Sequence, residues 1–136
     1  MAVRPAGEAE VLARARARLD RLGLYPEPVN MSGVRIHVVP WLFRVPGFRR
    51  FGGYAIARRI LLKRGPLDED LIVHELCHLW QEQHEPLRMW LSYARPSTFR
   101  RDRSAYRANR YEREARAAVA STRAVSPAGR WVAEGQ

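Results

Sequence analysis

The chain lacks the features that would place it outside the cell or in a membrane. Cys77 is its single cysteine, so no intrachain disulfide can form, and a reducing compartment is expected. No apolar run approaches the roughly 18 residues that a membrane-spanning helix needs. Residues 1–17 also lack the uninterrupted apolar segment of a secretory signal. We therefore expect a cytoplasmic protein without a membrane span.

Lysine is nearly absent as well, because Lys63 is the only one among 24 basic residues. With 14 acidic residues the net charge is +10, which is compatible with a nucleic-acid partner. The arginines are scattered and not grouped with stacking aromatics, so an arginine-rich composition without such a partner is favoured. Residues 66–87 are the exception, with six acids and no Lys or Arg. An acidic segment within a basic chain is a candidate cation site.

The 136 residues are long enough for a single domain, which we expect to be of the α+β class. Apolar periodicity predicts helices at 7–23, 67–83, 87–94 and 109–123, and alternation predicts strands at 34–39 and within 54–63. Residues 41–45 are apolar but too short to assign, and residues 124–136 form a tail. The expected order is an N-terminal helix, a small and mostly antiparallel sheet, and then the remaining helices.

One short motif carries chemistry. Residues 74–78 read H-E-x-x-H in the middle of a predicted helix. His74 and His78 are four residues apart, so both imidazoles leave one helix face and can bind one ion, with zinc the expected metal. Glu75 lies beside His74 around the helix axis and is placed to act as a general base on a metal-bound water rather than as a ligand.

A catalytic zinc site needs a third protein ligand, and two regions compete for that role. His84 has the spacing of the three-histidine zincins, but those have a glycine turn where this chain has Gln81. On a continued helix His84 would lie roughly 15 Å along the axis from His74 and would face solvent. Glu112 lies in the first turn of the predicted helix after Asn109, a good N-cap. Glu114 is a weaker alternative on the same turn.

Residues 53–117 resemble small gluzincin-type zinc metallopeptidase domains of an actinobacterial type. The matching segments are R-R-I-L-L-K-R-G (58–65), H-E-L-C-H-L-W-Q (74–81) and A-Y-R-A-N-R-Y-E-R-E-A-R-A (105–117). The resemblance implies a zincin-like fold with a metal-site core at about 53–123. It also implies His74, His78 and Glu112 as zinc ligands and Glu75 as the base.

The function expected from this resemblance is zinc-dependent hydrolysis of a peptide or protein substrate. The strand within 54–62 would line the cleft and bind an extended peptide by strand addition. Tyr106 or Tyr111 could donate a hydrogen bond to an oxyanion, and Cys77 is expected to be a buried apolar residue.

Two alternatives stay open. One is a nucleic-acid- or ribosome-associated metal hydrolase with three histidine ligands, similar to SprT-like, WLM-like or rRNA-maturation families. The other is a non-catalytic zinc domain that acts as an interaction module.

Overall fold

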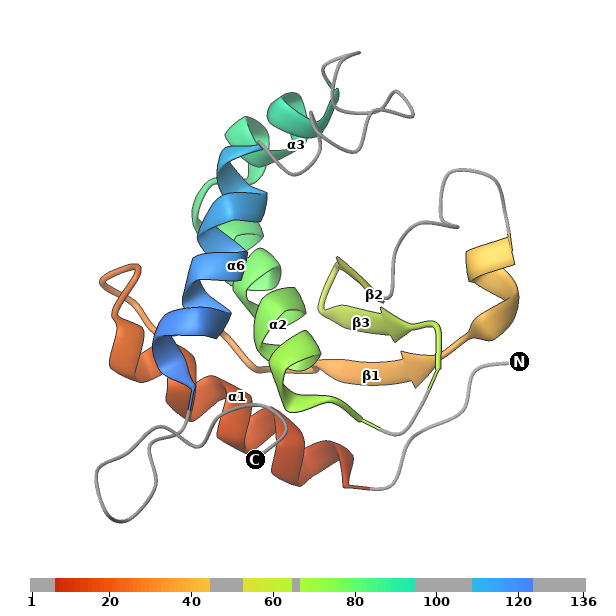
Figure 1. The fold of residues 1–136 in the computed structure, drawn as a ribbon. Helices are drawn as coiled ribbons and strands as arrows, with labels where there is room; N and C mark the ends of the chain where they lie inside the picture. Colours follow the sequence, from red (N-terminus) through yellow and green to blue (C-terminus); the bar gives the residue numbers. More distant parts are fainter. Residues whose placement is uncertain (1–6, 45–52, 65–66, 95–108, 124–136) are drawn as a thin grey trace.

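The computed structural model describes residues 7–44, 53–64, 67–94 and 109–123, which form an α+β fold (Figure 1). The N-terminal half contains helix α1 (Glu8–Leu22), strand β1 (Arg35–Val38), the 3₁₀ helix η1 (Pro40–Arg44) and strands β2 (Gly53–Ile56) and β3 (Arg59–Leu62). The C-terminal half contains helices α2 (Glu69–His84), α3 (Pro86–Ala94) and α6 (Arg110–Thr122). These bounds confirm the predicted helices to within two residues at each end.

The three described strands form one mixed sheet in the order β1-β3-β2. β2 and β3 are antiparallel, but β1 and β3 are parallel, so the expectation of a mostly antiparallel sheet is wrong for one of the two pairings. Parallel neighbours need a connection of a dozen or more residues. Residues 39–58 provide that length between β1 and β3. The alternation of apolar residues predicts a strand but carries no information on its direction.

A two-residue turn joins β2 to β3, with Ile56 paired to Arg59. The turn residues Ala57 and Arg58 both have positive φ, at 47° and 68°. This is the backbone of a type I′ turn, which matches the twist of the strands but usually uses Asn-Gly. The hairpin therefore forms in spite of its turn residues, because the strands on either side are held by the sheet and by α2.

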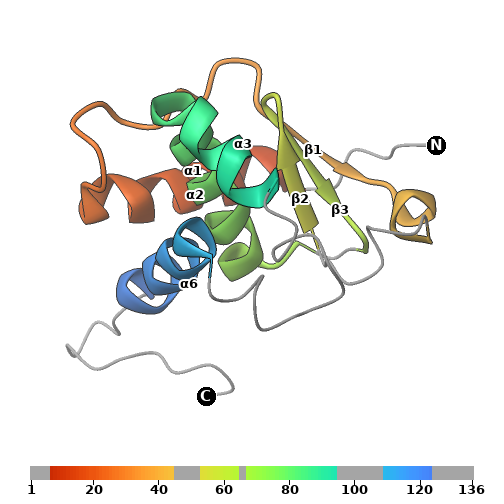
Figure 2. The same ribbon diagram turned by 90° about the horizontal axis from the view of Figure 1, so that it is seen from above.

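Helix α2 is the central element of the fold. It lies between the sheet and α6 and crosses α1 (Figures 1 and 2). Asp68 caps its N-terminus by accepting a hydrogen bond from the backbone N–H of Asp70. Glu69 and Asp70 lie in the first turn, where their negative charges interact favourably with the positive end of the helix dipole. α2 is therefore buried on most sides, and the elements packed around it hold its side chains in place.

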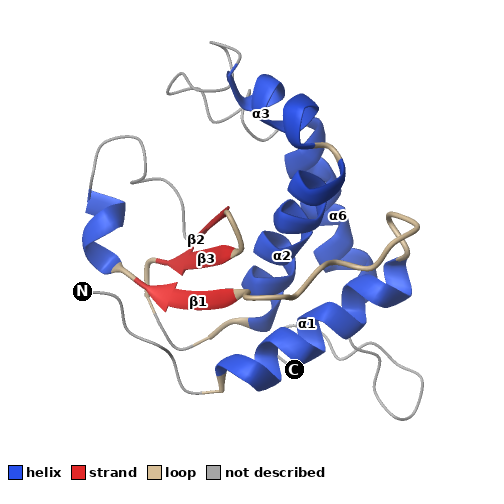
Figure 3. Ribbon diagram, turned by 180° about the vertical axis from the view of Figure 1, so that it is seen from behind, coloured by secondary structure: helices blue, strands red, loops and turns tan. Residues whose placement is uncertain are grey.

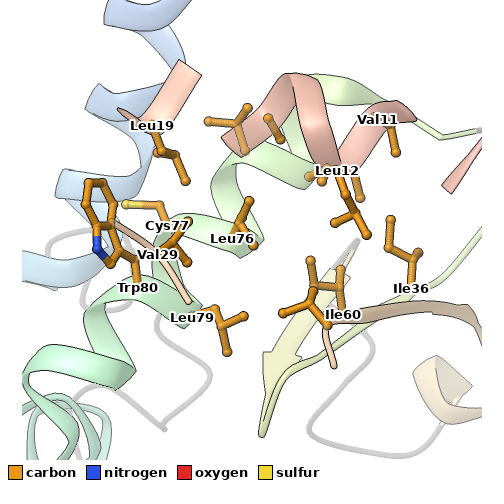
Figure 4. Packing of buried hydrophobic residues seen from close by; sticks show 14 of the residues in the cluster. Val11, Leu12, Leu19, Val29, Ile36, Ile60, Leu76, Cys77, Leu79 and Trp80 are labelled. Atoms are coloured by element: carbon orange, nitrogen blue, oxygen red, sulfur yellow. The ribbon is translucent and has the colours of Figure 1, made fainter. Parts of the chain in front are cut away.

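The hydrophobic core is formed where α1, α2 and the sheet meet (Figures 3 and 4). Cys77 is fully buried here, as expected for a small apolar residue, and burial raises the pKa of its thiol above the ordinary value. No helix among the described residues is both long and apolar enough to cross a membrane. The principal core residues are Val11, Leu12, Leu19, Ile36, Ile60, Leu76, Leu79 and Trp80.

A buried arginine ties the three large helices together. The guanidinium of Arg18 on α1 donates to Glu69 (3.0 Å) and Asp70 (2.8 Å) on α2 and to the Thr122 hydroxyl (3.1 Å) on α6. A charge buried with several charge-assisted hydrogen bonds is costly to displace. The network therefore fixes how α6 lies along α2, and it does so at the end of α6 opposite to Glu112.

Candidate metal centre

The two histidines of the motif lie one turn apart on the same side of α2. Their ring centroids are 4.8 Å apart, with the rings nearly perpendicular. His78 is buried, and the His74 side chain is 18% exposed. The i, i+4 spacing thus brings two imidazole nitrogens to one place at the edge of the core.

Glu112 reaches the same place from α6. The Asn109 side chain caps this helix by accepting from the backbone N–H groups of Tyr111 (2.8 Å) and Glu112 (3.4 Å), as the sequence predicted. Ala115, one turn later, is fully buried against the core and lets α6 lie close to α2. These two residues start the helix at the right point and bring its first turn near the histidines.

The carboxylate of Glu112 contacts both imidazoles. Its Oε1 lies 2.8 Å from Nε2 of His74, and its Oε2 lies 2.9 Å from Nε2 of His78. One ligand atom from each of the three residues lies within 4.8 Å of the others. Among the described residues no other such group of three histidine, cysteine or acidic side chains occurs.

The electrostatics of this group favour a cation between the three side chains. Burial would raise the pKa of Glu112, but hydrogen bonds from His74 and His78 outweigh burial and hold it well below the ordinary value. Burial would likewise lower the pKa of His78, and the hydrogen bond and charge of Glu112 raise it instead. The guanidinium of Arg116 lies 3.8 Å from Oε1 of Glu112 and pairs with this carboxylate.

The chemistry of the three donor groups also suits zinc. Two imidazole nitrogens and one carboxylate oxygen are a common ligand set of catalytic zinc, which leaves a fourth position for water or substrate. The three residues come from two helices that are packed against each other and tied by Arg18. The packing of α2 against α6 therefore brings the three predicted ligands together.

Glu75 is buried beside this group but is not part of it. The carboxyl is 5% exposed, and burial raises its pKa, although the two motif histidines act in the opposite direction. Gly53 at the start of β2 adjoins this carboxyl. A Cβ atom at Gly53 would lie 3.2 Å from Oε2 of Glu75. The missing side chain leaves Glu75 the room it occupies between α2 and β2.

The competing ligands lie elsewhere. His84 is stacked on Tyr25 with ring centroids 4.5 Å apart, and its Nδ1 lies 3.7 Å from Glu27 Oε2. It is thus partly covered rather than facing solvent, and it is not one of the three grouped residues. Glu114 accepts a hydrogen bond from Nε2 of Gln81 (2.9 Å) and is likewise outside the group.

Of the two tyrosines expected as oxyanion donors, the structure describes only Tyr111. The hydroxyl of Tyr111 donates to Oε1 of Glu85 (3.4 Å), near the C-terminal end of α2. Tyr106 lies outside the described residues.

Sequence reasoning missed two residues near the group. Tyr54 of β2 lies near Glu75, and its pKa is raised by burial first and then by the charges of Glu82 and Glu75. Gln81 is fully buried, and its Oε1 lies 2.8 Å from Nδ1 of His78. For Gln81 the sequence does contain a signal, because a polar residue three positions after His78 lies on the same side of the helix.

Comparisons with family models, with characterised proteins and with solved structures found no match for this chain.

Proposed function

We propose that this chain is a zinc-dependent peptidase. The observation that carries the proposal is the convergence of His74, His78 and Glu112 within 4.8 Å, with a second buried acid, Glu75, beside them. A structural zinc site is normally closed by four protein ligands, whereas three ligands are typical of catalysis. A group of three such side chains among the described residues favours an enzyme over a non-catalytic zinc module.

The three grouped side chains would hold the ion, and Glu75 would move protons. Bound zinc supplies a water of lowered pKa and polarises a carbonyl oxygen. A carboxylate whose pKa is raised by burial is a better proton acceptor near neutral pH, so Glu75 suits the role of general base. Glu75 can hold the proton on a carboxylate oxygen and pass it to the leaving amine. His74 and His78 serve as ligands only and take no part in this proton transfer.

The sheet supports a peptide as the substrate. β2 is an outer strand of the described sheet in the order β1-β3-β2, and an outer strand is the place where an extended peptide can be added. Gly53, at the start of this edge strand, adjoins Glu75. A peptide added along β2 would receive main-chain hydrogen bonds while one of its peptide bonds lies near the base.

A peptide-library experiment tests this function. Zinc-loaded protein is incubated with a diverse peptide mixture, and new termini are identified by mass spectrometry. Glu75→Gln is expected to keep its zinc and to lower cleavage by about 10²–10⁴-fold. Glu82→Gln is the matched control, because Glu82 lies two turns further along α2 and its pKa is also raised by burial. It should cleave like the wild type.

Three results would overturn the proposal. One is equal cleavage by Glu75→Gln and the wild type, which would assign the activity to another protein or residue. Another is the absence of zinc from the wild type. The third is zinc-dependent cleavage of RNA or DNA with no cleavage of any peptide, which would favour the nucleic-acid hydrolase suggested by the net charge of +10.

A further inference from the structure

Gln81 makes hydrogen bonds to both helices that carry the candidate ligands. Its side chain is fully buried. Besides the 2.8 Å contact of Oε1 with Nδ1 of His78, its Nε2 donates to the backbone carbonyl of Tyr111 (3.0 Å) and to Oε1 of Glu114 (2.9 Å). A buried amide with its polar atoms all paired is held in one orientation.

The direction of these bonds follows from the chemistry of the partners. A backbone carbonyl and a carboxylate both accept, so they require the two N–H groups of the Gln81 amide. A flipped amide would place its oxygen against two acceptors. Oε1 must therefore face His78 and accept, which means that Nδ1 of His78 carries the hydrogen.

The tautomer of His78 decides what its other nitrogen can do. When Nδ1 carries the hydrogen of a neutral imidazole, Nε2 holds a lone pair and is the nitrogen that can bind a metal. That Nε2 lies 2.9 Å from Oε2 of Glu112. Two lone pairs at this distance need a proton or a cation between them. Gln81 thus makes His78 a metal ligand through Nε2.

The contact with Tyr111 acts on the other ligand. Tyr111 immediately precedes Glu112 in the first turn of α6, and its carbonyl is held by the Gln81 amide on α2. Gln81 therefore adds a direct link between His78 and the backbone next to Glu112, at the end of α6 opposite to the Arg18 network.

We propose that Gln81 is a positioning residue, which selects the Nδ1–H tautomer of His78 and holds the first turn of α6 beside it. This inference rests on the metal site of the proposed function. Partners of this kind orient ligands and raise their basicity, and their removal typically lowers metal affinity by about 10–100-fold.

Zinc titration against a competing chelator tests the proposal on the full chain. Gln81→Leu removes the polar atoms at similar volume and should weaken zinc binding by about 10–100-fold. Gln83→Leu is the matched control, since Gln83 lies on the same helix but bonds to the backbone of Asn30. Its zinc affinity should equal that of the wild type.

Nitrogen-15 NMR of the histidine rings adds a readout that general destabilisation does not move. In the zinc-loaded wild type, His78 should show Nδ1–H and a metal-bound Nε2. Gln81→Glu keeps an acceptor for Nδ1, so it should keep this tautomer, although its second carboxylate oxygen faces two acceptors, the Tyr111 carbonyl and Glu114. The wild-type spectrum needs no substitution, so this test does not depend on the folding of either variant.

The failures of the two proposals are distinguishable. A wild type that binds no zinc overturns the metal site and this inference with it. A wild type that binds zinc, together with a folded Gln81→Leu of equal zinc affinity, overturns only the role of Gln81. An Nε2–H tautomer in zinc-loaded wild type or Gln81→Glu does the same.

Discussion

His78 on α2 and Glu112 on α6 are 34 residues apart in sequence, yet Nε2 of His78 lies 2.9 Å from Oε2 of Glu112. The contact joins two helices that also share the Arg18 network at their far ends. Two separate links along one helix pair leave little freedom for sliding or rotation. A metal bound by this pair would therefore stabilise the packing of α6 against α2, and metal affinity and folding stability should be coupled.

The first prediction concerns zinc content and stability. Wild-type protein should bind close to one zinc per chain, and saturation at 100 times the dissociation constant should add about 2.7 kcal/mol to the free energy of unfolding. His74→Ala and His78→Ala should each lose the zinc and this added stability. His37→Ala, on β1, is the control and should keep both. Metal analysis and thermal unfolding with and without zinc provide the measurements.

The second prediction distinguishes the possible third ligands. Glu112→Ala should weaken zinc binding by at least about tenfold, because the carboxylate is one of three ligands. His84→Ala should bind zinc like the wild type, since His84 is stacked on Tyr25 and lies outside the group. Competition with a chelator measures both. The reverse ranking would show a three-histidine site and would favour the nucleic-acid hydrolase.

The candidate ligands could be predicted from sequence because each depends on local rules. Helical spacing places His74 and His78 on one side of α2, and the Asn109 cap sets where α6 begins relative to Glu112. Ala115 is small enough for close packing, which local sequence also shows. Helix capping and periodicity thus place each of these residues on its own helix, whereas their convergence depends on the packing of α6 against α2.

The remaining features depend on contacts between distant segments. The parallel pairing of β1 with β3 joins two strands that are distant in sequence, and strand alternation contains no sign of their relative direction. The role of Gln81 requires Tyr111 and Glu114 to lie across from it, 30 and 33 residues later. Within its own helix, Gln81 indicates only that the helix continues.

The third prediction is the pH dependence of the metal-free protein. The folded-state pKa of His78 is raised above 6.5, and that of Glu75 above 4.5, so folding takes up protons at both groups. Their contribution to stability is therefore lost as pH rises through the raised values. The pKa of Glu112 is lowered from 4.5, so its contribution is lost as pH falls below that value. The Glu112 contribution is complete only above about pH 4.5, that of Glu75 declines from about pH 4.5 upward and that of His78 from about pH 6.5 upward, so stability should be greatest near pH 4.5 and should fall as the pH rises further.

Thermal unfolding in a chelator across pH 4 to 9 checks this dependence. Zinc should reverse the alkaline trend, because metal and protons compete for the same nitrogens and zinc affinity rises with pH. His78→Ala removes the raised histidine and should flatten the alkaline side of the metal-free profile. A metal-free protein that becomes steadily more stable from pH 6 to 9 would contradict the pairing of His78 with Glu112.

The last prediction concerns the turn between β2 and β3. Ala57 and Arg58 have φ values of 47° and 68°, a region in which a residue with a Cβ is strained and Asn-Gly is preferred. The double substitution Ala57→Asn with Arg58→Gly should raise the free energy of unfolding by about 1–2 kcal/mol, since left-handed backbone costs about that much per L-residue. The loss of the exposed hydrogen bond from Arg58 to the Ser32 carbonyl offsets part of the gain. The backbone N–H at position 57 that bonds to Glu82 is kept.

Gly33→Ala is the inverse control for this turn variant. The φ of Gly33 is 73° and nothing lies within 4 Å of an added Cβ, so only the backbone cost of about 1 kcal/mol should appear. Denaturant unfolding measures both variants. Zinc affinity should be unchanged in each, because neither turn contributes to the ligand group. If the turn variant lost stability, the interactions of the Arg58 side chain would contribute more free energy to the hairpin than the left-handed backbone of the turn costs.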